Sequence, residues 1–257
     1  MPDILKSLVR NLFTVRQRYR LKQYLPGLWY RNDLRRLALF FGTDKEGAHF
    51  YSQHYQHHFA PVRHKALRIL EIGVGGLDDV RAGGDSLRMW KAYFRRSQIF
   101  SIDIHDKSFH DEPRIRTFIG SQTDEEFLIR LNRDHGPFDI IIDDGSHFVE
   151  HVTTSFKILF PLLAPDGIYV VEDTQTSYWP EARGLAFGGS TDRSAPHTSM
   201  NFLKALVDGL NHEEFLDPEY VPTYFDRHIV AMHFYHNLVF VYKGLQNEGS
   251  PFLRPRS

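Results

Sequence analysis

The chain contains no cysteine among its 257 residues. Disulfides, thiolate metal sites, iron–sulfur clusters and thiol nucleophiles are therefore excluded. Any bound metal ion must be held by oxygen atoms or imidazole nitrogens. The lack of cysteine also fits an intracellular protein, and we predict a cytoplasmic location.

A long apolar run is missing as well. No stretch approaches the roughly 18 to 20 apolar residues that span a bilayer. The N-terminus has no continuous apolar core followed by a small-residue cleavage site. We therefore expect no stable insertion into a membrane.

An excess of one charge is also absent, since 31 Lys and Arg residues face 32 Asp and Glu residues. Such a chain has no overall field that would draw it to a polyphosphate backbone, so no nucleic acid partner is predicted. The 42% of apolar and 25% of charged residues are typical of a globular protein rather than a disordered or fibrous one.

The first 62 residues are predicted to form a helical segment. Residues 1–22 contain six Lys or Arg residues and one acidic residue, with Leu5, Leu8 and Leu12 at helical spacing. This pattern predicts a basic amphipathic helix, which we expect to pack on its own domain or on a second subunit rather than on a membrane. A second helix is predicted over residues 33–41, and a packed aromatic helix within residues 49–59. We expect this segment to act as a cap or an oligomerisation element of a homo-oligomer.

Residues 63–257 alternate short apolar runs with helical patterns. This alternation predicts a doubly wound, Rossmann-like α/β domain whose ligands lie beyond the carboxyl ends of parallel strands. Two closely spaced runs near the end predict an antiparallel hairpin that closes the sheet. The Gly-, Ser- and Pro-rich segment at about 174–199 is predicted to be a lid. The predicted strands are 67–72, 98–104, 115–119, 138–142, 168–171, 227–234 and 238–242, and the predicted helices are 86–95, 124–134 and 149–163.

A glycine-rich turn follows the first predicted strand, at Gly73, Gly75 and Gly76. The missing side chains would let a nucleotide-like cofactor approach the backbone. The turn lacks the third glycine of a dinucleotide fingerprint, because Asp78 stands there. Asp103 ends the second predicted strand, where a carboxylate can accept hydrogen bonds from ribose hydroxyls. Small or amide side chains follow the third strand at Ser121 and Gln122 and could bind an adenine edge.

Acidic residues follow the fourth and fifth predicted strands, as Asp143-Asp144 and Glu172-Asp173. Carboxylates gathered there would repel one another unless a cation bridged them. Oxygen ligands favour Mg²⁺, with Mn²⁺ and Ca²⁺ left open. His147 would face the same cavity and could take a proton from a hydroxyl group. The alternative is that these acids merely cap the elements that follow them.

Together these motifs resemble the sugar O-methyltransferases of antibiotic pathways that depend on S-adenosylmethionine (SAM), including the mycinamicin, tylosin and calicheamicin types and the methylmannose-polysaccharide enzyme. The likeness rests on Gly42–Lys45, Leu70–Gly76, Asp143–His147 and Val171–Asp173. It implies a class I methyltransferase fold with six parallel strands and one antiparallel strand. It also implies that Asp144, Glu172 and Asp173 hold Mg²⁺, that His147 is the general base, and that Asp143 is a substitute ligand or an anchor. The cofactor residues it implies are Thr43, Glu71, Gly73, Ser86, Asp103, Ser121 and Gln122.

The expected acceptor is a sugar-bearing small molecule or a glycan. Three alternatives stay open: a catechol-type Mg²⁺-dependent O-methyltransferase, an NAD(P)-dependent oxidoreductase, and a non-catalytic binding protein. The absent third glycine and the terminal hairpin count against the oxidoreductase, and the paired carboxylates count against the non-catalytic protein. The sequence does not specify the sugar, the hydroxyl group or the number of subunits.

Overall fold

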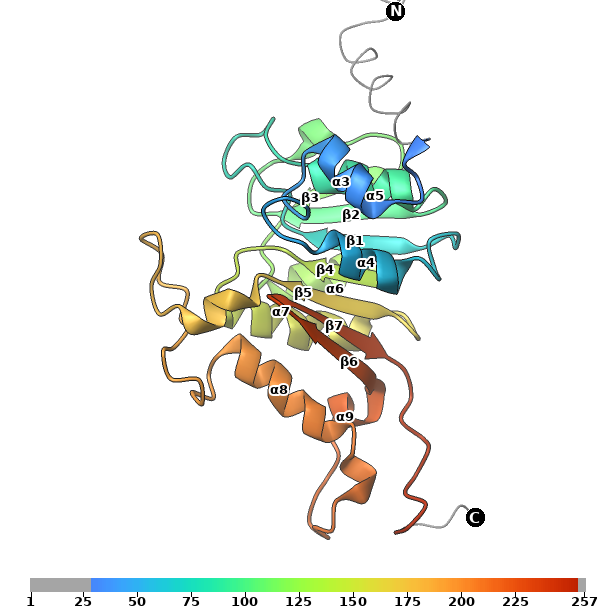
Figure 1. Ribbon diagram of the computed structural model, residues 1–257, viewed down its shortest axis with the longest axis vertical. Coiled ribbons are helices and arrows are strands. Elements are labelled where there is room, and N and C mark those ends of the chain that lie inside the picture. Colours follow the sequence, from blue (N-terminus) through green and yellow to red (C-terminus); the bar gives the residue numbers. More distant parts are fainter. Residues whose placement is uncertain (1–28, 254–257) are drawn as a thin grey trace, which may run out of the picture. The chain divides into compact units, whose positions relative to one another are not determined.

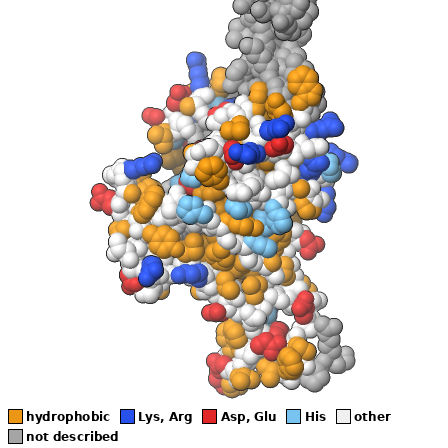
Figure 2. Space-filling model, viewed as in Figure 1, with side chains coloured by type: hydrophobic (Ala, Val, Ile, Leu, Met, Phe, Trp, Pro, Cys, Tyr) orange, Lys and Arg blue, Asp and Glu red, His pale blue; other side chains and the backbone are white. Residues whose placement is uncertain are grey.

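The computed structural model describes residues 29–253, and the predicted basic helix of residues 1–22 lies outside them. The chain divides into two compact units. Of the described residues, one unit comprises 29–66 and 83–97, and the other comprises 67–82 and 98–253. Within residues 29–253, no helix has the length and apolar character needed to cross a bilayer. Acidic and basic side chains both occur on the face shown in Figure 2, in keeping with the balanced composition.

Among the described residues, the first unit contains three helices: α3 (Leu34–Phe41), α4 (Ser52–Phe59) and α5 (Asp85–Tyr93). The Asp33 side chain caps α3 by accepting from the Arg36 amide, and Gly42 ends this helix in the left-handed region. Tyr55, Phe59 and Trp90 are fully buried and meet ring to ring at 5.0–5.9 Å. The predicted helix at residues 33–41 and the aromatic helix are confirmed.

The second unit is built on a seven-stranded sheet in the order β3-β2-β1-β4-β5-β7-β6 (Figure 1). Strands β1 to β5 pair in parallel, and β7 pairs antiparallel with both β5 and β6. The six parallel strands, the single antiparallel strand and the closing hairpin are therefore confirmed. The strands are β1 (Arg68–Ile72), β2 (Gln98–Asp103), β3 (Ile115–Ile119), β4 (Ile140–Asp143), β5 (Ile168–Glu172), β6 (Ile229–Tyr235) and β7 (Leu238–Lys243).

Helices cover this sheet and supply its core. Helix α7 buries Phe156 and Phe160, whose rings stack at 5.1 Å, and Phe156 meets Tyr169 of β5 edge to face at 4.9 Å. This packing fixes α7, and with it the loop that leads from β4 into the helix. The helices of the unit are α6 (Glu125–His135), α7 (Val149–Leu162), α8 (Ser199–Gly209) and α9 (Tyr224–His228), with short 3-10 turns η1 (Ser108–His110), η2 (Thr174–Tyr178) and η3 (His212–Glu214).

The predicted lid, at about 174–199, begins with η2 and lies between β5 and α8. Its Phe187 carbonyl accepts a hydrogen bond of 2.9 Å from the Val149 amide at the start of α7. The Phe187 ring also packs on Phe148 at 5.4 Å. The segment is therefore attached to the residues that directly follow His147, and its movement stays a prediction.

Candidate active site beyond strands β4 and β5

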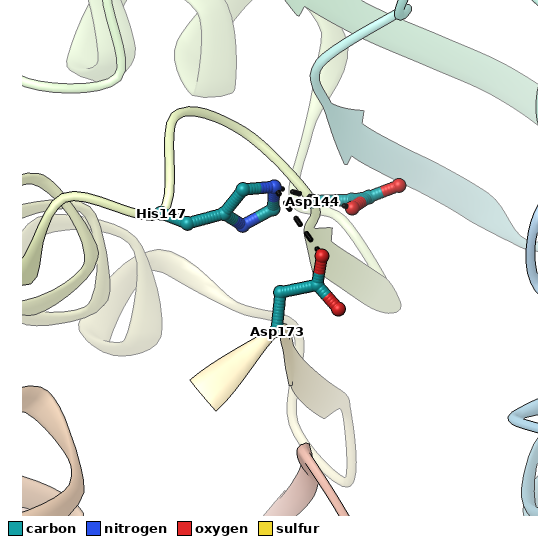
Figure 3. Close-up of side chains that lie close together, drawn as sticks. All are labelled: Asp144, His147 and Asp173. Carbon is teal, nitrogen blue, oxygen red and sulfur yellow. Dashed lines mark ion pairs between the residues drawn. The ribbon is translucent and has the colours of Figure 1, made fainter. Parts of the chain in front are cut away.

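Three chemically active side chains meet at the carboxyl ends of β4 and β5. Asp144 directly follows β4, His147 lies in the loop before α7, and Asp173 directly follows β5. Their potential ligand atoms all lie within 4.8 Å of one another. The imidazole points between the two carboxylates, with Nε2 at 3.9 Å from Asp144 Oδ1 and 3.7 Å from Asp173 Oδ2 (Figure 3). Parallel pairing of β4 with β5 places these groups side by side.

Two of these residues have an uncommon backbone conformation. His147 has φ of 59° and Asp173 has φ of 54°, in the left-handed region that side-chain-bearing residues seldom adopt. Asp and His tolerate this region better than most residues, at a cost of order 1–3 kcal/mol when they are held there. Both turns direct their side chains into the same cluster, so the two strained backbone positions lie at the candidate site.

The glycine turn after β1 touches the loop that carries Asp144. Gly73 has φ of 92°, and a Cβ atom placed on it would lie 2.3 Å from the Asp144 carbonyl oxygen. The Asp144 amide in turn donates to the Ile72 carbonyl at 3.1 Å. The bare glycine therefore permits close packing of two loops, and it holds the predicted cofactor turn directly beside the acidic cluster.

The cluster fits a divalent cation in its donor set. Asp144, His147 and Asp173 are partly buried, with side chains 17–24% exposed. Two carboxylates at a partly desolvated site favour a bound positive charge, and their hard oxygen atoms suit Mg²⁺. Moreover, His147 Nδ1 is buried and has no hydrogen-bond partner among residues 29–253. A buried polar atom without a partner calls for an explanation, and the adjoining acidic cluster is consistent with a polar ligand close to this ring.

The other two predicted metal-site carboxylates lie differently. Glu172 is the last residue of β5, is 3% exposed and is not one of the three clustered residues. Asp143 is the last residue of β4 and points into the interior, where Ser155 Oγ donates to it at 2.5 Å and Tyr169 Oη at 3.3 Å. Burial raises the pKa of the Asp143 carboxyl, while the Ser155 hydrogen bond acts in the opposite direction. Asp143 thus occupies a buried polar network.

Four predicted cofactor residues besides Gly73 belong to the sheet unit. The Asp103 carboxylate accepts from the Val74 amide of the glycine turn at 3.0 Å and from the His105 amide at 2.9 Å. Glu71 is completely buried in β1, and its carbonyl accepts from Ser101 Oγ at 2.7 Å. Ser121 Oγ bonds Thr123 Oγ1 at 2.9 Å after β3. Asp103 thereby lies at the glycine turn, where a ribose would bind.

The fourth of these residues, Gln122, makes contacts that the sequence does not indicate. Its amide Oε1 accepts from the Ser146 amide at 2.9 Å, and its Nε2 donates to Asp143 Oδ1 at 3.1 Å. These contacts lie on the acidic loop. The remaining two predicted cofactor residues belong to the helical unit, where Thr43 directly follows Gly42 at the end of α3 and Ser86 lies in the first turn of α5.

Further residues that shape the loop were absent from the prediction. Ser146 Oγ pairs with His151 Nδ1 of α7 at 2.8 Å, and the Phe148 ring packs on His151 at 5.2 Å. Ser155 and Tyr169 support Asp143 from α7 and β5. These contacts join segments distant in sequence, and the only local signal was the position of Ser146 and His151 beside His147.

Comparison with known proteins gives close relatives. No protein-family model matches the chain. It is 50% identical over 220 residues to mycinamicin VI 2''-O-methyltransferase of Micromonospora griseorubida, covering 84% of this chain and 54% of the relative. It is 52% identical over 208 residues to 8-demethyl-8-alpha-L-rhamnosyl tetracenomycin-C 2'-O-methyltransferase of Streptomyces olivaceus, covering 80% and 53%. The chain spans about half the length of the curated relatives it matches.

A solved structure shows the same fold. A methyltransferase from the mycinamycin biosynthetic pathway, in complex with Mg, SAH and mycinamycin VI, superimposes with a TM-score of 0.81 at 49% sequence identity. The match covers 88% of this chain and 57% of that one. The class I, Rossmann-like methyltransferase fold and the resemblance predicted from the motifs are thus confirmed.

Proposed function

Because the chain is homologous to O-methyltransferases that act on the sugars of antibiotics, we propose that it transfers a methyl group from SAM to a sugar hydroxyl group. The acceptor would be a glycosylated natural product or a polysaccharide. The observation that carries this proposal is the cluster of Asp144, His147 and Asp173 packed against the glycine turn at Gly73. Methyl donor and acceptor would then meet where the two loops touch.

Asp144 and Asp173 would hold the cation, which we propose to be Mg²⁺, with Glu172 as the third ligand that the resemblance implies. A divalent cation at this site supplies positive charge that lowers the pKa of a nearby sugar hydroxyl group. His147 would accept the hydroxyl proton on an imidazole nitrogen, because it is the titratable base that lies between the carboxylates. Once the proton is on the imidazole, Asp144 and Asp173 stabilise the resulting positive charge.

The cofactor would lie along the ends of β1, β2 and β3. SAM supplies a methyl group on a positively charged sulfur, which makes the methyl carbon electrophilic. Asp103 would bind the ribose hydroxyls, with Gly73 and Glu71 beside β1 and Ser121 after β3. Thr43 and Ser86 stay cofactor residues that the resemblance implies. Holding the cofactor and the acceptor in line lowers the entropic part of the barrier, which can amount to several kcal/mol.

Location and assembly are part of the same proposal. A reaction that consumes SAM takes place where cells make and keep this cofactor, so we propose a cytoplasmic enzyme. We also propose a homo-oligomer, which light scattering on the purified full chain would test. The relatives extend well beyond the matched region, so the acceptor of this chain need not be a macrolide or a tetracenomycin.

The decisive experiment measures methyl transfer from labelled SAM to a panel of glycosides and of catechols, with Mg²⁺ and with EDTA. Labelling of glycosides that EDTA abolishes and Mg²⁺ restores would support the proposal. Labelling restricted to catechols would favour a catechol-type enzyme instead. Failure to bind SAM in a calorimetric titration would refute methyl transfer altogether.

A further inference from the structure

Gln122 occupies a position that couples three parts of the site. It follows β3 and is 6% exposed, although the site it borders is partly open. Both ends of its amide are used: Oε1 accepts from the Ser146 amide at 2.9 Å, and Nε2 donates to the Asp143 carboxylate at 3.1 and 3.4 Å. The bonding pattern also fixes the orientation of the amide, since a carboxylate can only accept.

The loop between Asp143 and Phe148 is short and carries two of the three clustered residues, Asp144 and His147. Gln122 bonds this loop at its centre, through Ser146, and at its base, through Asp143. A Cβ atom on Gly145 would lie 2.3 Å from Gln122 Oε1. Glycine at this position therefore lets the loop lie directly against the amide.

We propose that Gln122 is a positioning residue that holds the 144–147 loop in the conformation that presents Asp144 and His147 to a divalent cation and an acceptor. This inference rests on the proposed function and deepens it. The resemblance implies instead that Gln122 binds the cofactor. The geometry favours the loop, because Oε1 bonds Ser146 within it, Nε2 bonds Asp143 at its base, and the His147 backbone is held at a positive φ.

The physical reason is preorganisation. A metal site binds tightly when its ligands already stand in place, because ordering a loop on binding consumes part of the binding free energy. Without the amide, the Ser146 N–H loses its acceptor while Asp143 keeps its Ser155 and Tyr169 donors. The loop should then fluctuate, although the buried network stays largely intact.

The test compares Gln122→Ala with Tyr169→Phe in the full chain. Tyr169 Oη donates to the same carboxylate at 3.3 Å but, among the described residues, bonds neither Gln122 nor the 144–147 loop, so its variant is the matched control. We would measure Mn²⁺ binding by the paramagnetic resonance signal of the free ion, SAH binding by calorimetry, and hydrogen exchange of the peptide that contains Ser146.

For Gln122→Ala we expect the Kd for Mn²⁺ to be about tenfold or more above that of the unmodified chain. The Kd for SAH should stay within about twofold, and the amide hydrogens of the peptide that contains Ser146 should exchange faster. For Tyr169→Phe we expect both Kd values and the exchange rate within about twofold of the original.

A raised Kd for SAH with unchanged Mn²⁺ binding and exchange would overturn the proposal and make Gln122 a cofactor residue. Absent Mn²⁺ binding by the unmodified chain would also overturn it. If Gln122→Ala fails to fold, Gly145→Ala replaces it, because the added methyl group displaces the amide while Gln122 is retained. Its effect should match that expected for Gln122→Ala, and an unchanged Kd for Mn²⁺ would count against the proposal. A failure of the proposed function would look different from a failure of this proposal. The variants would still differ in their Kd for Mn²⁺, but no glycoside would be methylated.

Discussion

At the scale of single residues, His147 combines three features that rarely occur together. Its backbone is in the left-handed region, its Nε2 faces two carboxylates, and its buried Nδ1 has no partner among residues 29–253. Most buried nitrogen atoms in proteins have a hydrogen-bond partner, and Trp90 Nε1 is another exception in this structure. The environment of His147 is therefore arranged for a ligand or a proton rather than for stability.

Replacing His147 with Ala should lower kcat by roughly 10²- to 10⁴-fold, the usual contribution of a general base. The Kd for SAH should change by less than about twofold, because the role of the base arises at the chemical step. Steady-state methyl transfer and calorimetry would measure the two quantities. The matched control is His64→Ala, since His64 is exposed and lies in the helical unit. Unchanged turnover would remove His147 as the base, and a Kd for Mn²⁺ raised more than tenfold would make it a metal ligand instead.

Gly73 permits a contact that no other residue would. Gly73→Ala would place a methyl group 2.3 Å from the Asp144 carbonyl oxygen at a φ of 92°. We expect a loss of roughly 2 kcal/mol or more in the free energy of unfolding, measured by urea denaturation. Gly184→Ala is the control, because φ is 76° there and nothing lies within 4 Å of the added atom. Equal losses in the two variants would show that backbone strain, and not the contact with Asp144, makes glycine necessary.

At the scale of elements, the end of α7 is attached to β7 by one lysine. Lys243 is 9% exposed, and its Nζ donates to the Pro161 and Leu163 carbonyls at 2.8 and 2.6 Å. These carbonyls lie at the C-terminus of α7, where a helix has unpaired acceptors and a negative dipole end. Lys243 thus stabilises the helix whose first turn follows His147.

Replacing Lys243 with Met should lower the free energy of unfolding by roughly 2 kcal/mol, since two charged hydrogen bonds to buried carbonyls are lost. Urea denaturation would measure the change. Lys204→Met is the control, because Lys204 is exposed on α8 and should alter stability by less than about 0.5 kcal/mol. Equal effects of the two substitutions would show that the contact with α7 is not stabilising.

At the scale of the whole molecule, the alternation of apolar runs and helical patterns was sufficient to predict the strands and a parallel sheet, whereas the arrangement of six parallel strands and one antiparallel strand was predicted from the resemblance to methyltransferases. Helix α7 was predicted at 149–163 and lies at Val149–Leu162, and the strand predicted at 115–119 has those bounds. Helix α8 was absent from the prediction, although Thr198 caps it by accepting from the Asn201 amide. It follows a long irregular segment that masked this local signal.

The acidic cluster was predictable for a topological reason, because neighbouring parallel strands end at the same edge of a sheet. The direction of each side chain was not. Asp143 and Asp144 are adjacent in sequence, yet one enters the core and the other enters the site. The role of Gln122 depends on segments that meet only after folding, so no local pattern contains it.

The response of the molecule to alkali follows from its buried tyrosines. Burial raises the pKa of Tyr93 and of Tyr242 to about 12. A phenol whose pKa is raised on folding stabilises the protein below the unfolded value of about 10, and this stability is lost as the pH rises from about 10 towards 12. Lys243 acts in the opposite direction, because burial lowers its pKa and stability then grows as the pH approaches the unfolded value. The two tyrosines outweigh one lysine, so a net loss is expected.

Urea midpoints measured from about pH 8 to about pH 11 should therefore fall steeply above about pH 10. Tyr93 belongs to the helical unit and Tyr242 to the sheet unit. Tyr93→Phe and Tyr242→Phe should each flatten the decline of the urea midpoint with pH, whatever their effect at neutral pH. The change of the urea midpoint with pH is the quantity to compare. Tyr93 Oη also accepts from Gln56 Nε2 at 3.1 Å, so removing this hydroxyl group lowers the stability at every pH. A midpoint that stays constant between about pH 9 and 11 would mean that these phenols ionise in the folded protein as readily as in the unfolded chain.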